Sequence, residues 1–284
     1  MKVSFERQGK AIMFLKRKII FIISVLVLNN FNIAFAKDNS ITIAGSTTIL
    51  PISERWAKVF KEKTGISVNV HGGGSTGGIN ATKIGTADIA ASSREMSSQE
   101  KESLKSVVIG RDALVVILNK SNPIDNLSVE QLRDIYLGRI TNWKQLNGPN
   151  KLVQLVNRES GSGTKTLFQE LVVHSIGSKN LQMSLKSIVN NSNAEVKETV
   201  RLIPGAIGYV SFGFVDDSVN GINVNLVKPT ISNIKMNKYK LVRNLYYLVR
   251  DDNSQLIKRF LEFVLSKDAQ QVVLKEGYLP ASSV

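Results

Sequence analysis

Cysteine is absent from this sequence of 284 residues, and histidine occurs only twice. Without a thiol the chain forms no disulfide, offers no cysteine nucleophile or metal ligand, and carries no lipid on a cysteine behind a signal peptide. His71 and His174 alone make a poor zinc site, and no G-x-S-x-G motif marks a nucleophilic serine. We therefore expect no metal, no cofactor and no enzymatic activity.

A long basic run is also missing, although the formal net charge is +14. Six Lys or Arg and one Glu lie in residues 1–36, so removal of that segment lowers the charge to +9. In the remainder, Lys and Arg are scattered and are not interleaved with aromatic residues, which argues against a nucleic-acid partner. A basic surface of this kind attracts small anions, or anionic lipid and cell-wall polymers, equally well.

The hydrophobic run at residues 19–28 is too short to cross a bilayer comfortably. Basic residues 16–18 precede it, and an A-x-A sequence ending at Ala36 follows it, which is typical of a cleavable signal peptide. We predict that residues 1–36 are removed and that the protein is exported to the periplasm without a lipid anchor. Met13 is an alternative start of the chain.

Hydroxyl-rich turns recur after short apolar strands. With 43% hydrophobic residues the chain is long enough for two domains. In its first part, turns of Ser, Thr or Gly at 45–48, 71–78 and 92–94 each follow such a strand, and helical patterns follow the turns. This alternation predicts a parallel sheet, in which ligands bind at the carboxyl ends of the strands.

A fourth such turn, residues 158–164, follows the apolar run 152–156 and precedes a helical pattern. Unpaired N–H groups at a helix start and the guanidinium of Arg158 are suited to an oxyanion. The turn is not a nucleotide P-loop, because Thr164 and not Gly stands before Lys165. Alone, this turn is equally well explained as an ordinary strand-to-helix connection with a Ser or Thr helix cap. Four such turns, two of them with an arginine, favour oxyanion binding.

Two long apolar strands, near residues 112–119 and 240–249, bracket a middle block with its own helices and its own anion turn. Such an arrangement predicts an α/β fold of two lobes with a ligand cleft between them, which can close by a hinge motion. We place residues 37–114 and 244–284 in lobe one and residues 115–243 in lobe two.

Five motifs, at residues 44–51, 73–78, 87–94, 140–143 and 158–164, occur in an order that resembles the phosphate-binding proteins of the ABC phosphate importer, the PstS family. The resemblance covers residue 41 to the C-terminus. It implies the two-lobed type II periplasmic binding protein fold, often called a Venus flytrap. It also implies a monomer that captures inorganic phosphate and delivers it to a permease in the inner membrane.

Carried over by motif, the resemblance assigns hydroxyl and N–H donors to the turns of lobe one and a guanidinium with further donors to lobe two. Well-known members have an Asp where this chain has Ser93, and Arg94 would add a second cation. The basis for choosing phosphate over sulfate is therefore open. A receptor for sulfate or molybdate, a surface adhesin and a phosphatase are the alternatives. The predicted ligand-binding residues are Thr47, Thr48, Ser75, Ser93, Arg94, Arg158, Ser162, Gly163 and Thr164.

Overall fold

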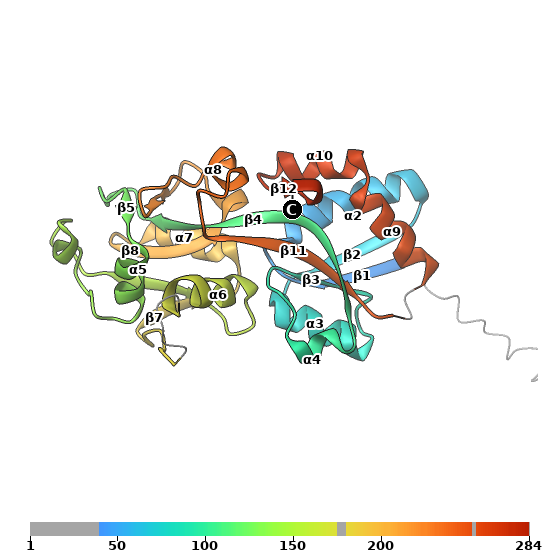
Figure 1. Cartoon of the computed structure of the whole chain (residues 1–284), viewed down its shortest axis with the longest axis horizontal. Helices are drawn as coiled ribbons and strands as arrows, with labels where there is room; N and C mark the ends of the chain where they lie inside the picture. The colour runs from blue at the N-terminus through green and yellow to red at the C-terminus, as the bar shows by residue number, and fades with distance from the viewer. Residues whose placement is uncertain (1–39, 175–179, 252–253, 284) are drawn as a thin grey trace, which may run out of the picture. The chain divides into compact units, whose positions relative to one another are not determined.

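The structure of the chain, a computed structural model, describes residues 40–174, 180–251 and 254–283 (Figure 1). The predicted signal peptide, residues 1–36, lies outside these ranges. Residues from Ser40 onward form one compact unit. Within the described ranges, no helix is both long and apolar enough to cross a membrane.

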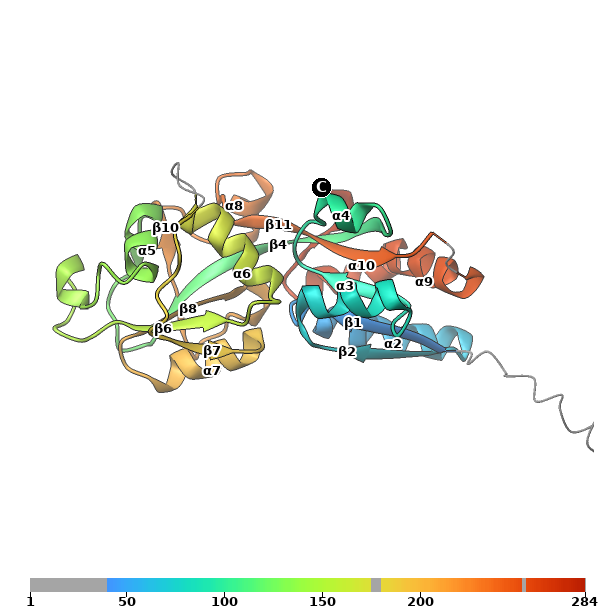
Figure 2. The same ribbon diagram turned by 90° about the horizontal axis from the view of Figure 1, so that it is seen from below.

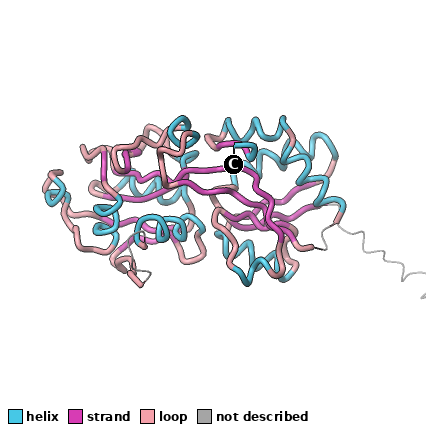
Figure 3. Tube along the Cα trace, in the orientation of Figure 1, coloured by secondary structure: helices cyan, strands magenta, loops and turns pink. Residues whose placement is uncertain are grey.

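A mixed sheet of ten strands runs through this unit, with helices on both sides of the strands (Figure 3). The short strands β9 (Asn220–Gly221) and β12 (Leu279–Pro280) pair with β4, while β5 (Asn126–Leu127) and β10 (Asn223–Val224) form a separate pair. In spatial order, the eight main strands are β2 (Ser67–His71), β1 (Ser40–Gly45), β3 (Ile89–Ser92), β11 (Val242–Val249), β4 (Lys105–Leu118), β8 (Ala206–Ser211), β6 (Gln154–Arg158) and β7 (Ser187–Asn190).

The direction of the strands explains why the turns gather. Strand β1 is parallel to β2 and to β3, and β6 is parallel to β7 and to β8. In each of these two groups the carboxyl ends therefore lie at one edge, where the chain turns into the following helix. The predicted α/β fold with parallel strands is confirmed, and the long strands β4 and β11 run antiparallel to each other.

Local sequence signals mark the ends of several helices, whereas the single helix expected over residues 253–277 is divided at Ser266 into α9 and α10. Pro51 stands in the first turn of α2, Gly65 ends it in the left-handed conformation, and Ser97 forms a capping box with Glu100 at α4. The α-helices are α2 (Leu50–Thr64), α3 (Gly74–Ile84), α4 (Ser98–Lys101), α5 (Val129–Tyr136), α6 (Gly163–Phe168), α7 (Asn193–Leu202), α8 (Ile231–Lys235), α9 (Gln255–Leu265) and α10 (Lys267–Lys275). Shorter turns are η1 (Trp143–Leu146), η3 (Phe212–Phe214), η4 (Ala281–Ser283) and the π-helical η2 (Gln169–Val173), which continues α6.

Buried side chains form separate hydrophobic cores on the two groups of strands. One core contains Trp56 and Phe260 and the other contains Trp143 and Phe168, all of them 1% exposed or less. The indole N–H of Trp143 is satisfied by the carbonyl of Gly205 at 2.9 Å, so this large ring is buried without an unpaired donor. Each of the two groups of strands therefore has buried hydrophobic residues of its own.

The long strands β4 and β11 connect the two groups (Figures 1 and 2). Strand β4 pairs with β11 up to Ala113 and with β8 from Leu114 onward. The lobe boundaries 37–114, 115–243 and 244–284 remain a prediction, but the change of partner shows where β4 passes from one group of strands to the other. Asp112 and Arg243 lie directly opposite each other in the register, just before this point.

Candidate functional site

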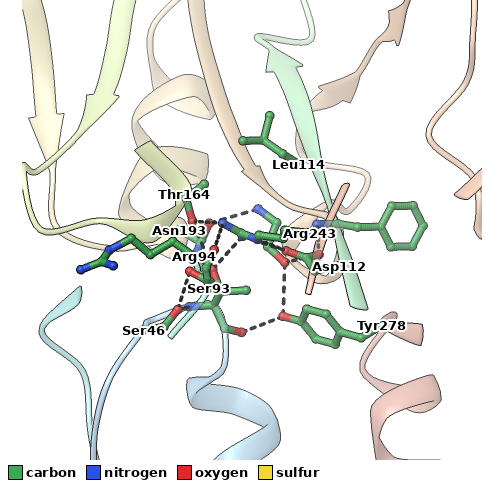
Figure 4. A network of polar contacts seen from close by, with 12 residues as sticks. Ser46, Ser93, Arg94, Asp112, Leu114, Thr164, Asn193, Arg243 and Tyr278 are labelled. Carbon is green, nitrogen blue, oxygen red and sulfur yellow. Dashed lines mark hydrogen bonds and ion pairs between the residues drawn. The ribbon is translucent and has the colours of Figure 1, made fainter. Parts of the chain in front are cut away.

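The turns that the sequence singles out meet at the carboxyl ends of the strands. The hydroxyl oxygens of Thr48, after β1, and Thr164, in α6, lie 3.2 Å apart. Ser75, at the start of α3, accepts a hydrogen bond of 3.1 Å from the backbone N–H of Ser93, which follows β3. We call the group that meets here the polar cluster; it consists of Ser46, Thr47, Thr48, Ser75, Ser93, Arg158, Ser162, Gly163, Thr164, Asn193 and Arg243. Figure 4 labels Ser46, Ser93, Thr164, Asn193 and Arg243 of this cluster.

Deep burial distinguishes this cluster from a solvated polar surface. Thr47 is 8% exposed, and every other residue with a polar side chain in the cluster is less exposed than that. Buried hydroxyl and guanidinium groups need hydrogen-bond partners, since an unpaired one costs about 1–3 kcal/mol or more. Most of these groups find their partners across the gap between the two groups of strands.

Arg158, the last residue of β6, gives the clearest indication that the cluster binds an anion. Its Nε and Nη2 atoms donate to the carboxylate of Glu159 at 2.8 and 2.9 Å, and Nη2 also donates to the hydroxyl of Thr47 at 3.2 Å. Its third nitrogen, Nη1, is buried and has no partner among the described residues. A charged donor in that position is suited to an anion oxygen, because a charge-assisted hydrogen bond is worth about 1.5–3 kcal/mol.

Gly163 and Ser162 position the start of α6. The hydroxyl of Ser162 caps the helix by accepting the N–H of Lys165 at 3.2 Å, so this side chain is turned toward its own helix. Gly163 lies so close to the turns that contain Ser75 and Ser93 that an added Cβ would be 2.5 Å from Oγ of Ser75 and 2.7 Å from Oγ of Ser93. Only a glycine allows the two turns to approach this closely.

Arg243 is a second buried cation of the cluster and was missed in the sequence. It lies on β11, and Nε and Nη2 donate to Oδ2 of Asp112 at 3.0 and 2.7 Å. It also reaches both sides of the cluster, since Nη2 donates to Oγ1 of Thr48 at 3.1 Å and Nη1 to Oγ1 of Thr164 at 3.0 Å. A sequence signal did exist, because a charged residue inside an apolar strand is seldom buried without a partner.

Asp112 neutralises Arg243 inside the protein. Burial raises the pKa of the Asp112 carboxyl above its ordinary value, and the attraction and hydrogen bonds of Arg243 oppose that rise. Its other oxygen, Oδ1, accepts from the hydroxyl of Ser211 at 2.9 Å and from the N–H of Phe212 at 3.3 Å. Both carboxylate oxygens are therefore occupied.

Asn193, the first residue of α7, was also missed, because the polar stretch around it reads as a loop. Its amide Nδ2 donates to the hydroxyls of Thr47 at 3.4 Å and Thr48 at 3.1 Å, and its Oδ1 accepts the N–H of Ser211 at 3.0 Å. Tyr278 donates to the backbone carbonyl of Thr48 at 2.9 Å. These contacts come from residues far apart in sequence, and no local pattern indicates them.

Arg94 is the predicted residue that the structure does not bring to the cluster. Its guanidinium points away from the network in Figure 4 and binds the carboxylate of Glu100 through two hydrogen bonds of 2.8 Å. These hydrogen bonds lower the pKa of Glu100 to about 2. The second guanidinium in contact with the threonines is that of Arg243, and we do not carry Arg94 into the proposed site.

One cavity adjoins the cluster, and a larger one contains no residue of the cluster. A cavity of about 130 Å³ adjoins it, with Leu167, Glu170 and Arg243 in its lining. A larger cavity of about 670 Å³ beside Lys120 and Lys228 contains none of the predicted residues. In the described ranges no three His, Asp or Glu residues are grouped as a metal site. The cluster is therefore the candidate site.

Comparison with known proteins agrees with the motifs. The profile of the PBP superfamily domain matches residues 34–268. The phosphate-binding protein PstS of Borreliella burgdorferi is 32% identical over an alignment of 272 residues that covers 92% of this chain and 96% of that protein. The phosphate-binding protein PstS of Bacillus subtilis is 30% identical over an alignment of 253 residues that covers 86% of this chain and 82% of that protein.

Solved structures confirm the predicted type II periplasmic binding protein fold. A phosphate ABC transporter substrate-binding protein from Clostridium perfringens, solved with bound phosphate, superposes with a TM-score of 0.81 at 36% identity, covering 85% of this chain and 99% of that one. An ABC-type phosphate transport receptor from Vibrio cholerae superposes with a TM-score of 0.71 at 35% identity, covering 84% and 99%. The chain thus belongs to the PBP superfamily and, within it, to the PstS family of phosphate-binding proteins.

Proposed function

We propose that this protein captures inorganic phosphate in the polar cluster and delivers it to the permease of an ABC importer. The observation that carries the proposal is the buried Nη1 of Arg158, a charged donor without a partner among the described residues. It lies on the same guanidinium that contacts the Thr47 hydroxyl from the other group of strands. A tetrahedral oxyanion offers acceptors in several directions and is suited to donors that converge in this way.

Oriented backbone N–H groups, and not a net charge on the side chains, favour an anion in the cluster. Arg158 and Arg243 are matched by the carboxylates of Glu159 and Asp112, at 2.8 and 2.7 Å, so the arginines hold no excess charge. The backbone N–H groups at the starts of α2, α3 and α7 add partial positive charge near the cluster. Oriented N–H and O–H dipoles can stabilise a dianion where solvent is excluded, because the local dielectric constant is low.

The rest of the proposed role follows the family. We place the mature protein outside the cytoplasm as a monomer, with the permease as its partner and without catalytic activity. His71 is exposed on β2, and the ring of His174 contacts the carbonyl of Leu181, so among the described residues neither histidine contacts a cluster hydroxyl. A hydroxyl without an adjacent base is a weak nucleophile, which supports binding without turnover.

Titration calorimetry of the mature protein with inorganic phosphate tests the proposed function. About eight hydrogen bonds, less an ordering cost of several kcal/mol, lead us to expect one site with a Kd near micromolar or tighter. The same titration with molybdate covers the alternative receptor. Absence of phosphate binding, or turnover of a generic phosphate ester, would contradict the proposal.

Gly163→Ala is expected to weaken phosphate binding by at least tenfold while the free energy of unfolding changes little. The new methyl group would lie 2.5 Å from Oγ of Ser75, so the two turns could no longer approach each other. Gly161→Ala is the matched control, because its methyl would meet only Cβ of Thr76, at an ordinary 3.6 Å. Calorimetry of both variants decides the matter, and equal phosphate affinities would refute a site between these turns.

A further inference from the structure

A second cavity, of about 670 Å³, lies beside β4 and β9 and shares no residue with the polar cluster. Its lining includes the buried side chains of Val115, Val219 and Ile222, all of them 3% exposed or less. Phe212 and Val215 add further apolar surface. Sites for small molecules typically have volumes of about 300–1,000 Å³ and mainly apolar walls with a few polar groups. The size and the wall of this cavity therefore suit a small ligand with apolar parts.

Asn122 adds a buried donor to the lining of this cavity. The residue is 2% exposed, and its Nδ2 atom has no hydrogen-bond partner among the described residues. The orientation of the amide is defined, because Oδ1 accepts the N–H of Ile124 at 3.1 Å. Since a buried donor without a partner is unfavourable, an acceptor oxygen on a ligand is suited to Nδ2.

The loop that carries Asn122 is held in place by the protein itself. Asn119 donates through Nδ2 to the carbonyls of Val200 and Arg201 at 2.9 and 2.8 Å. The carbonyl of Asn119 accepts the N–H of Asn122 at 2.9 Å, and the carbonyl of Asn122 accepts from Nδ2 of Asn220 at 3.3 Å. A donor on a fixed loop is preorganised, which lowers the ordering cost of binding a ligand.

Charged side chains of both signs surround the cavity. Asp216 is already neutralised, because it binds Lys197 at 2.6 Å, and this hydrogen bond lowers the pKa of Asp216. Four other lining side chains have no hydrogen bond or ion pair with another described residue: Lys120, Asp125, Asp217 and Lys228. Two ammonium groups and two carboxylates sum to zero charge. The cavity therefore complements a ligand with one charge of each sign better than a simple anion or cation.

We infer that this cavity binds a short apolar peptide with free termini. The side chains of the peptide pack on the apolar lining at Val115, Val219 and Ile222. Its terminal carboxylate accepts a hydrogen bond from Nδ2 of Asn122 and is neutralised by the two lysines, and its terminal ammonium is neutralised by the two free aspartates. The volume lies within the range for drug-sized ligands, so we expect a peptide of about two or three residues.

Calorimetric titration of the mature protein with trileucine tests this inference. We expect one site with a Kd below about 1 mM. Triglycine has both termini but no apolar side chains, so it should bind about ten times more weakly or worse. N-acetyl-trileucine and trileucine amide each lack one terminal charge, so each should bind about three times more weakly or worse.

Two variants locate the peptide in the cavity. Asn122→Asp keeps an acceptor oxygen for the loop but replaces the donor, so the trileucine Kd should rise about tenfold or more. The double variant Lys120→Glu with Lys228→Glu reverses both cations and should weaken trileucine by a similar factor. The matched control, Lys235→Glu with Lys238→Glu, makes the same charge change at exposed residues outside the cavity. It should change the trileucine Kd less than about twofold.

Several outcomes would overturn the inference. Trileucine that does not bind at millimolar concentration, or that binds no better than triglycine or either blocked form, contradicts a site for an apolar zwitterion. Equal losses in the cavity variant and the control variant of the lysines contradict the location. Circular dichroism shows which variants are folded, and the exposed lysines keep the test decisive if Asn122→Asp does not fold.

The outcome is separate from that for phosphate. Protein that binds phosphate but no peptide contradicts only this inference, and protein that binds the peptide but no phosphate contradicts only the proposed function.

Discussion

Replacing Arg158 with methionine is expected to raise the Kd for phosphate at least 100-fold in calorimetry. The change removes the unpaired Nη1 donor and the contact of Nη2 with Thr47. The hydrogen bond from Nη1 to the anion is worth about 1.5–3 kcal/mol, or about 10- to 150-fold in Kd, and the Glu159 carboxylate left without its counter-charge adds repulsion. Methionine keeps most of the apolar stem, so the packing at the end of β6 is retained.

Glu159 makes this prediction sharper. The Glu159 side chain is only 21% exposed. Without Arg158, its carboxylate would face the anion without a neutralising partner. The double variant Arg158→Met with Glu159→Gln removes that repulsion and is expected to recover about tenfold in affinity over the single variant. A single variant that binds phosphate as tightly as the wild type, while circular dichroism shows it folded, would exclude Arg158 from the site.

Asp112→Asn is expected to lower the free energy of unfolding by about 3–5 kcal/mol, measured by urea unfolding. It leaves the Arg243 guanidinium, 3% exposed, without a counter-charge in the interior. The double variant Asp112→Leu with Arg243→Met removes both charges and should recover a large part of that loss, because an apolar pair avoids the cost of desolvating the ions. Single and double variants with equal stability would show that the pair is not coupled.

A surface pair provides the comparison. Arg55 and Glu276 lie 2.5 Å apart, but the Arg55 side chain is 68% exposed. Glu276→Gln should therefore cost less than about 1 kcal/mol in the same experiment. A larger loss at this surface pair than at the buried pair would contradict the importance that we give to burial.

The loss of folding stability caused by Arg243→Met is expected to grow as the pH rises. Burial raises the pKa of Asp112, and without Arg243 nothing of opposite charge opposes the rise. A group with a raised folded-state pKa contributes stability that is complete below its unfolded pKa of about 3.9 and is lost as the pH rises through the folded value. Arg243→Met should therefore lose least, relative to the wild type, near pH 4 and most near pH 7.

The sequence predicted the turns well because their signals are local. A strand that ends in Ser, Thr or Gly before a helix places hydroxyls at the edge of a parallel sheet, and Thr48 and Thr164 do meet there. Motif order then identified the family. The assignment of these residues as phosphate ligands remains a proposal, since it depends on how a ligand binds and not only on where the turns lie.

For the missed residues, the local sequence does not indicate which partner each side chain meets. Asp112 and Arg243 are separated by 131 positions, and each stands as a single charge within or beside an apolar run. Only the register of β4 with β11 places them opposite each other. The side-chain direction of Arg94 was equally hidden, because it depends on Glu100, which also closes the capping box of α4.

A crystal structure of the mature protein grown with orthophosphate tests the central claim most directly. We expect one phosphate within hydrogen-bond distance of Nη1 of Arg158, with its remaining oxygens on the Thr48, Ser75 and Thr164 turns. Phosphate bound elsewhere, or turns at these positions that make no contact with it, would contradict the account.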